Sequence, residues 1–348
     1  MNSRNLWRVG AIVAVLSLAA ASVALAEEEQ RVLELGKYYP SAETGLNVTQ
    51  SSYSNNWNGG DKGSIVWTWN FNGSLENQLN PKTNWLSTLK LAFGQTHQQV
   101  IDAQGDHQWD KPDKSTDLID LETIFRFTLG GYVDPFVSGR LESQFLDASD
   151  PNGRTLALNP LKFKESAGIA RQFINEEERS LLSRLGFTLR QSRRSFFEDN
   201  DPAGGFGDAT SSESTNDGGL EFITDYKNRI LDDNVAWTSK LGFYQPLFFS
   251  AKTDLEGLDL AGLGLDQDLA NFSTTLDIDW ENIFTAEITK HISVNLYTRW
   301  VYDKYDNSVA PKFDGAGDLE NPGALAAAVR KAGQFKQTLS LGFNYRLY

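Results

Sequence analysis

Residues 64–72 read SIVWTWNFN, and this stretch decides the fold because apolar and polar side chains alternate along it. One parity holds Ile65, Trp67, Trp69 and Phe71, and the other holds Thr68, Asn70 and Asn72. A period of two residues is typical of a β-strand with one apolar and one polar face. The stretch therefore predicts a two-faced strand.

The same alternation returns along most of the chain. Clear runs lie at 89–93, 119–129, 133–145, 181–189, 235–243, 276–288, 292–302 and 335–347, and weaker runs at 45–54, 161–174 and 217–228. Together with the first stretch they predict about twelve strands. Most of the aromatic residues lie on the apolar parity, where a membrane barrel carries its interfacial girdles.

The connections between these runs alternate between short and long. Short turns are expected at 80–83, 130–131, 175–178, 232–233 and 290–291, and long loops at 55–63, 98–115, 147–160, 194–216, 249–271 and 306–333. A soluble β-sandwich also has alternating strands, but it has no reason to sort its loops in this way. The pattern predicts an all-β fold, a transmembrane up-and-down antiparallel β-barrel of about 12 strands with short periplasmic turns and long external loops.

The N-terminal segment has the pattern of a secretory signal. Arg4 and Arg8 precede an apolar stretch, and Ala24-Leu25-Ala26 forms a small-residue cleavage site. We therefore expect a cleaved signal peptide at 1–26, a charged periplasmic leader at 27–44 and the barrel at 45–348. The expected location is the cell outer membrane, after export by the cleaved signal peptide.

Composition excludes several other classes of protein. The 348 residues include no Cys, so disulfides, thiolate metal sites and cysteine nucleophiles are impossible. The formal net charge is −14 without a basic block, which argues against nucleic-acid binding. We expect no cofactor.

Three segments resemble a known family. These are Ser54-Asn55-Asn56-Trp57-Asn58-Gly59-Gly60, Ile278-Asp279-Trp280-Glu281-Asn282, and Lys290 to Leu296 followed by Tyr302-Asp303. They resemble an uncharacterised domain-of-unknown-function family of Gram-negative outer-membrane-like β-barrel proteins, over roughly residues 45–348. The resemblance implies the barrel fold and supplies no catalytic or ligand residues.

Charged residues on the polar parity are candidates to line a pore. The basic candidates are Arg140, Lys162, Lys164, Arg184 and Arg190, and the acidic candidates are Glu221, Asp225, Asp277, Asp279, Glu281 and Glu287. Around a closed barrel, the two sets are expected to form a basic wall across from an acidic one. This arrangement favours a narrow channel for passive passage of small polar solutes.

Two alternatives stay open. The charges could instead form a network that fills a narrow lumen, which would leave a non-conducting structural or surface-interaction barrel. A membrane-embedded lipid hydrolase would need a Ser–His pair, and the one candidate pair is His97 with Ser143, both on the outward parity. The pair has no evident third partner, so we disfavour an enzyme.

The long loops carry most of the negative charge. Asp199, Asp201 and Asp208 do not match an EF-hand, so the simpler expectation is that the loops are solvated and repel one another, or are bridged to lipopolysaccharide through divalent ions. Residues 323–333 are expected to form a short helix that folds inward and narrows the mouth. The expected partners are outer-membrane lipid, lipopolysaccharide and the barrel assembly machinery, which reads the terminal strand.

Overall fold

The computed structural model describes residues 33–51, 62–101, 107–150, 152–176, 178–198 and 207–347. The expected signal peptide, the start of the leader, and both Asp199 and Asp201 lie outside the described residues. Within those ranges no helix has both the length and the apolar character that crossing a lipid bilayer requires.

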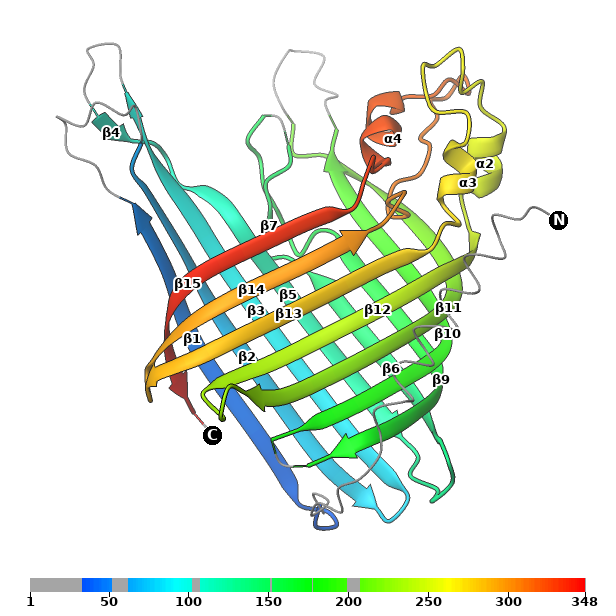
Figure 1. The fold of residues 1–348 in the computed structure, drawn as a ribbon. Coiled ribbons are helices and arrows are strands. Elements are labelled where there is room, and N and C mark those ends of the chain that lie inside the picture. Colours follow the sequence, from blue (N-terminus) through cyan, green and yellow to red (C-terminus); the bar gives the residue numbers. More distant parts are fainter. Residues whose placement is uncertain are drawn as a thin grey trace.

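Twelve antiparallel strands form a closed barrel (Figure 1). They are β1 (Tyr38–Ser51), β2 (Ser64–Asn80), β3 (Thr83–Ile101), β5 (Asp113–Arg126), β6 (Asp134–Ser143), β9 (Leu161–Asn175), β10 (Ser180–Phe197), β11 (Thr210–Ile230), β12 (Val235–Phe249), β13 (Asp277–Thr289), β14 (Ile292–Tyr302) and β15 (Gln334–Arg346). Each pairs with its neighbour in chain order, and β1 pairs with β15 to close the sheet. The predicted fold class and strand number are confirmed.

The expected sorting of the connections is also confirmed. Tight turns such as Lys290–His291 between β13 and β14 lie at one end of the barrel, and the long loops lie at the other (Figure 1). The long loops contain the short strands β4 (His107–Trp109), β7 (Leu146–Asp147) and β8 (Leu156–Ala157). They also contain the short helices α2 (Lys252–Glu256), α3 (Leu269–Phe272) and α4 (Pro322–Ala328).

Strand β1 begins before the expected start of the barrel. It pairs with β2 from Tyr38 onward, so residues 38–44 belong to the sheet and not to the leader. The apolar-to-polar alternation is weak here because Tyr38, Tyr39 and Pro40 are consecutive nonpolar or aromatic residues, and the period-two signal is lost.

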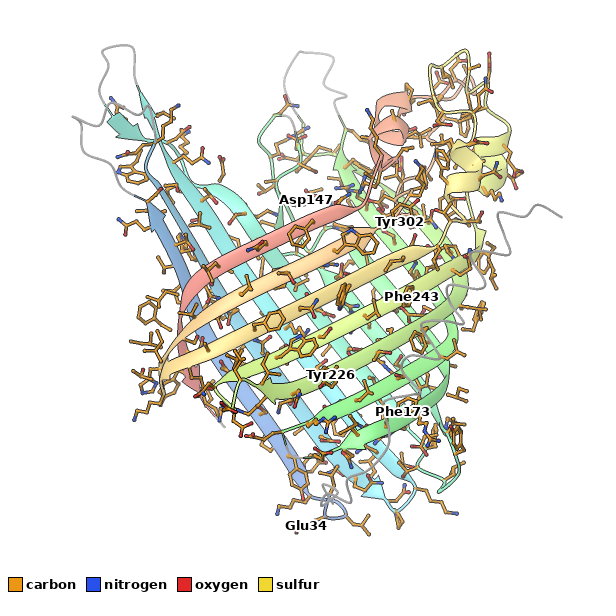
Figure 2. All side chains as sticks on the ribbon, viewed as in Figure 1. Glu34, Asp147, Phe173, Tyr226, Phe243 and Tyr302 are labelled. Atoms are coloured by element: carbon orange, nitrogen blue, oxygen red, sulfur yellow. The ribbon has the colours of Figure 1, made fainter. Side chains whose placement is uncertain are left out.

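The outer face of the barrel is apolar, with aromatic residues at both ends. Exposed side chains on it include Leu121, Val137, Ile169, Leu185, Leu220, Leu339 and Phe343. Trp85 packs on Phe125 and Trp237 on Phe284 near the short turns, and Trp67 packs on Phe93 near the long loops. Figure 2 shows Phe173 and Tyr226 toward the short-turn end and Tyr302 toward the long-loop end. An apolar outer surface between two aromatic bands matches the requirements of a lipid bilayer.

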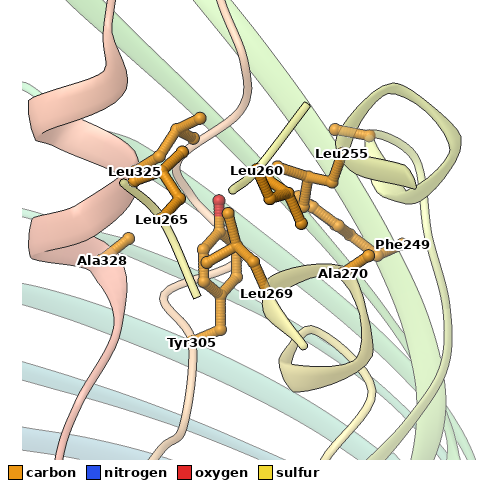
Figure 3. Close-up of a cluster of buried hydrophobic side chains, with 10 residues drawn as sticks. Phe249, Leu255, Leu260, Leu265, Leu269, Ala270, Tyr305, Leu325 and Ala328 are labelled. Carbon is orange, nitrogen blue, oxygen red and sulfur yellow. The ribbon is translucent and has the colours of Figure 1, made fainter. Parts of the chain in front are cut away.

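The main cluster of buried apolar side chains lies at the long-loop end and is formed mostly by residues of the long loops. Phe249, Leu255, Leu260, Leu265, Leu269, Tyr305, Leu325 and Ala328 belong to it. Figure 3 shows Tyr305 between helix α4, which carries Leu325, and the segment that carries Leu269. The expected helix at 323–333 is therefore present as α4, but it ends at Ala328 and packs against the 250–276 loop.

Candidate functional site: the barrel lumen

The barrel encloses one large cavity of about 1840 Å³. Its lining includes Glu178 and Lys290 at the short-turn end, and Asp303 and Asp306 beyond β14 at the long-loop end. The side chains of the polar parity point into it because the apolar parity faces outward on every strand. The cavity therefore extends between both ends of the barrel.

The structure places most of the pore-lining candidates on this cavity. Those that line it are Arg140, Lys162, Lys164, Arg190, Glu221, Asp277, Asp279, Glu281 and Glu287. Arg184 lies beside it, with 4% of its side chain exposed, and bonds to Asp225. The eleven residues are thus on or next to the lumen.

A ladder of three cations crosses one side of the lumen. Lys164 on β9 lies in register with Arg140 on β6 and with Arg190 on β10. Like charges directly opposite one another on adjacent strands repel. The ladder therefore requires carboxylates close by.

Carboxylates on the flanking strands meet that requirement. Arg140 Nε lies 2.6 Å from Asp120 Oδ1, and Arg190 Nε lies 2.7 Å from Asp217 Oδ1. Lys164 forms an ion pair with Glu221. The charges of the ladder are thus paired locally.

Arg184 occupies the most enclosed position of the network. Its guanidinium lies 2.9 Å from Glu122 on β5 and 3.2 Å from Asp225 on β11. Lys240 of β12 approaches the same Glu122 at 3.7 Å. Residues from four strands are therefore joined across the lumen in one charge network.

The expectation that a basic wall faces an acidic wall is wrong. Glu221 and Asp225 lie on β11, next to the basic strand β10, and Asp277 reaches Arg190 at 3.2 Å. Asp279 is paired with Arg299, and Glu281 accepts a hydrogen bond from Tyr297. The sequence showed which strands carry the basic residues and which carry the acidic ones. It could not show which side chains contact each other across the lumen.

Sequence reasoning missed the partners of the cations. Asp120, Glu122 and Asp217 hold Arg140, Arg184 and Arg190. Their position on the polar parity of β5 and β11 could have predicted these ion pairs. Acids that face the lumen from a strand near a basic strand are close enough to pair with its cations.

The opposite side of the lumen carries many uncharged amides and hydroxyls between its charged side chains. Thr285 Oγ1 donates to Asn295 Oδ1 at 2.9 Å, and Asn295 Nδ2 donates to Asn47 Oδ1 at 3.1 Å. Asn344 Nδ2 donates to Ser293 Oγ at 3.0 Å. Other cavity-lining residues of this amide wall are Thr68, Asn70, Asn72, Ser74, Thr338 and Ser340. The lumen thus has an ion-paired wall on β5–β11 and, on β13–β2, an amide wall in which amides and hydroxyls lie among charged residues such as Glu287, Arg299 and Lys336.

Two acids at the long-loop end have shifted pKa values. Burial, reinforced by the neighbouring charge of Asp306, raises the pKa of Asp303 to about 6. Burial also disfavours ionisation of Asp306, but Lys162 and the Ser308 hydrogen bonds outweigh it and hold its pKa below the ordinary value. The mouth therefore carries an acid, Asp303, with a pKa of about 6.

The candidate hydrolase pair is not brought together. Strand β5 lies between β3, which carries His97, and β6, which carries Ser143. Ser143 is buried, and its hydroxyl donates to the carbonyl of Pro160 at 3.0 Å. The Ser143 hydroxyl therefore takes part in a structural hydrogen bond.

The fold and the lumen define a closed antiparallel barrel with an apolar outer face and a polar interior. Residues 48–148 match the family model described as a protein of unknown function, DUF3078. The resemblance to a domain-of-unknown-function family is confirmed there. No curated protein is similar enough to the chain to count as a relative.

Solved structures with similar architecture include bacterial barrels. The translocator domain of the autotransporter NalP from Neisseria meningitidis is 11% identical, with 99% of this chain and 98% of that chain covered and a TM-score of 0.35. An outer membrane channel from Pseudomonas putida F1 is 11% identical, with 93% and 100% covered and a TM-score of 0.36. OccK7 from Pseudomonas aeruginosa is 8% identical, with 90% and 100% covered and a TM-score of 0.25. The barrel assignment rests on the chain's own strand pairing.

Proposed function

We propose that this protein is an integral outer-membrane β-barrel that forms a narrow channel for passive passage of small polar solutes. The observation that carries the proposal is the single cavity lined both by Lys290 at a short turn and by Asp306 in a long loop. The apolar outer face and the two aromatic bands support the membrane location. Export by a signal peptide at 1–26 and assembly through the terminal strand β15 belong to the same proposal.

The lining favours uncharged or zwitterionic solutes. Most charges on the ion-paired wall are neutralised by close partners, and the amide wall presents hydrogen-bond donors and acceptors among charges of both signs. Paired charges exert a weak net field on a passing ion. We expect low selectivity between small cations and anions.

Single-channel conductance of the refolded protein in a planar bilayer tests the channel. Lys162 and Glu287 line the cavity, and neither forms an ion pair among the described residues. Lys162→Glu is expected to shift the reversal potential in a salt gradient toward cations, and Glu287→Lys toward anions. Arg193→Glu is the control, because Arg193 is exposed on the outward parity of β10.

A second function is favoured by the dense packing around Arg184. Thr188 is fully buried and Ser166 is 8% exposed beside it, so this part of the lumen is filled. A non-conducting structural or surface-interaction barrel would use the long loops as its contact surface. If no channel conductance is recorded, although a heat-dependent shift in gel mobility shows that the barrel is folded, the channel proposal is overturned. The non-conducting function is then favoured.

A further inference from the structure

A band of asparagine side chains crosses the lumen face of the sheet where its two ends meet. Asn70 on β2 and Asn344 on β15 each lie in register with Gly45 on β1. Asn47 on β1 lies in register with Gly342 on β15. With Asn295 on β14 the band covers four adjacent strands, which at about 4.8 Å between neighbours is roughly 14 Å.

Glycines make room for these amides. A Cβ on Gly45 would lie 2.5 Å from Asn344 Oδ1 and 3.0 Å from Asn70 Oδ1. Because Gly45 has no side chain, the amides of both neighbouring strands lean over its backbone. Gly342 leaves the same space for Asn47 and Asn295. The positions of the amides are therefore set by the sheet itself.

Part of the hydrogen-bonding capacity of these amides is used within the wall. Asn295 Nδ2 donates to Asn47 Oδ1 at 3.1 Å, and Asn344 Nδ2 donates to Ser293 Oγ at 3.0 Å. Among the described residues, the other end of each of these two amides, Asn47 Nδ2 and Asn344 Oδ1, has no hydrogen-bond partner. A free donor and a free acceptor thus remain on this surface.

Strand β2 adds more free capacity. The side-chain amides of Asn70 and Asn72 form no hydrogen bond within the part of the chain that the structure describes. Both residues line the cavity, with Asn70 half-buried and Asn72 exposed. Each carboxamide offers two N–H donors and one carbonyl acceptor. We call these five asparagines, Asn47, Asn70, Asn72, Asn295 and Asn344, the amide patch.

Charges of both signs border the amide patch, but none belongs to it. Glu43 and Lys90 lie in register with Asn72 from either side, and Glu287 lies in register with Ser293. An ion of either sign therefore meets a like charge as well as an opposite one near the patch. A neutral solute with many hydrogen-bonding groups meets no such repulsion.

Vicinal hydroxyl groups match the carboxamides. A hydroxyl both donates and accepts, so two hydroxyls on adjacent carbons can donate one hydrogen bond to an amide oxygen and accept one from the amide nitrogen. The cavity of about 1840 Å³ exceeds the range of about 300–1,000 Å³ that is typical of small-molecule pockets. There is thus room for a solute of several sugar rings beside the patch.

We propose that the amide patch is a binding site for neutral polyhydroxylated solutes, namely short oligosaccharides. Their vicinal hydroxyls bond to Asn70, Asn72 and Asn344, and the chain of rings lies across β2, β1 and β15. This inference rests on the proposed channel and names the class of solute that the channel takes.

Calorimetric titration of the refolded protein with maltotriose tests the site without requiring conduction. We expect saturable binding. Permethylated maltotriose keeps the rings and loses every hydroxyl donor, so it should bind at least tenfold more weakly. Triglycine, a zwitterion that also carries amide groups, should bind at least fivefold more weakly than maltotriose. These comparisons test the site without any substitution in the protein.

The double substitution Asn70→Ala with Asn72→Ala should weaken maltotriose binding at least fivefold. Neither amide bonds to the described protein, so the heat-dependent gel mobility should remain that of the wild type. Asn70→Gln with Asn72→Gln retains the carboxamides and should recover part of the binding. Ser192→Ala is the control, because Ser192 borders the same cavity from β10 and its hydroxyl is buried.

Maltotriose binding that survives permethylation, or that is equal in the double Ala variant and the wild type, would overturn the site. Triglycine binding as tight as that of maltotriose would overturn the solute class. Conductance of the same preparations separates the two proposals. Current steps without maltotriose binding leave a channel without this site. Binding that depends on Asn70 and Asn72, in a protein that conducts nothing, retains the site and overturns the channel alone.

Discussion

The side-chain amide of Asn295 on β14 donates a hydrogen bond to the side-chain oxygen of Asn47 on β1 at 3.1 Å, across the intervening strand β15. Gly342 of β15 lies in register with Asn47 and makes this crossing possible. A Cβ on Gly342 would lie 2.3 Å from Asn295 Nδ2 and 2.9 Å from Asn47 Oδ1. The β1–β15 seam, with six residue pairs in register, is thus supported by a side-chain bond that needs a glycine.

Gly342→Ala should weaken closure of the barrel. The added methyl group displaces the Asn295 amide, so hydrogen bonds to Asn47 and Ser293 are lost, at a cost of about 1–3 kcal/mol. Urea unfolding followed by tryptophan fluorescence measures the loss. Gly139→Ala is the control, because a Cβ there meets nothing within 4 Å. Equal stability of the two variants would contradict the role of the amide bond.

Arg184→Ala should destabilise the barrel and not simply change its ion selectivity. The substitution leaves Glu122 and Asp225 without their shared partner in an enclosed site, which costs about 3–5 kcal/mol. The measurement is the midpoint of the heat-dependent mobility shift. Arg193→Ala, an exposed position on the same strand, should change stability by no more than about 0.5 kcal/mol. A variant with wild-type stability would show that the charge network is not structural.

Leu325→Ala should loosen the long loops and leave the barrel intact. Leu325 is fully buried in the cluster between α4 and the 250–276 loop, so the cavity created costs about 2–5 kcal/mol. Limited proteolysis should cut the 250–276 and 303–333 loops faster, with unchanged heat-dependent mobility. Leu263→Ala, at a position 38% exposed in the 250–276 loop, should be cut at the wild-type rate. If L325A also loses the heat-dependent mobility of the folded barrel, the loops do not pack independently of the barrel.

Acidification should stabilise the segment after β14. Burial raises the pKa of Asp303 to about 6, so the ionised carboxylate is less favourable in the folded loop than in the unfolded chain. Its stabilising contribution is present at low pH and is lost as pH rises through about 6. Asp306, with its lowered pKa, stays ionised over the same window.

Hydrogen exchange of residues 303–309, corrected for intrinsic rates, should therefore be slower at pH 5 than at pH 7. Asp303→Asn should abolish this difference. If the Asn variant retains the full difference, another group is responsible.

The sequence predicted the barrel because strand parity is a local property. Along the first half of β2, Trp67, Trp69 and Phe71 on one parity and Thr68, Asn70 and Asn72 on the other already determine which side faces lipid. Loop lengths likewise depend only on the spacing of the strands. The start of β1 escaped prediction because its first residues interrupt the alternation and are placed by pairing with β2.

The sequence by itself determined the strands, their two faces and the set of charges directed to the lumen. Only the tertiary structure decided which charges meet. Arg184 and Glu122 are 62 residues apart in sequence, and closure of the barrel brings them within 2.9 Å. The same closure joins Asn295 to Asn47. Periodicity is set by neighbouring residues, whereas ion pairs and seams depend on the register and curvature of the whole sheet.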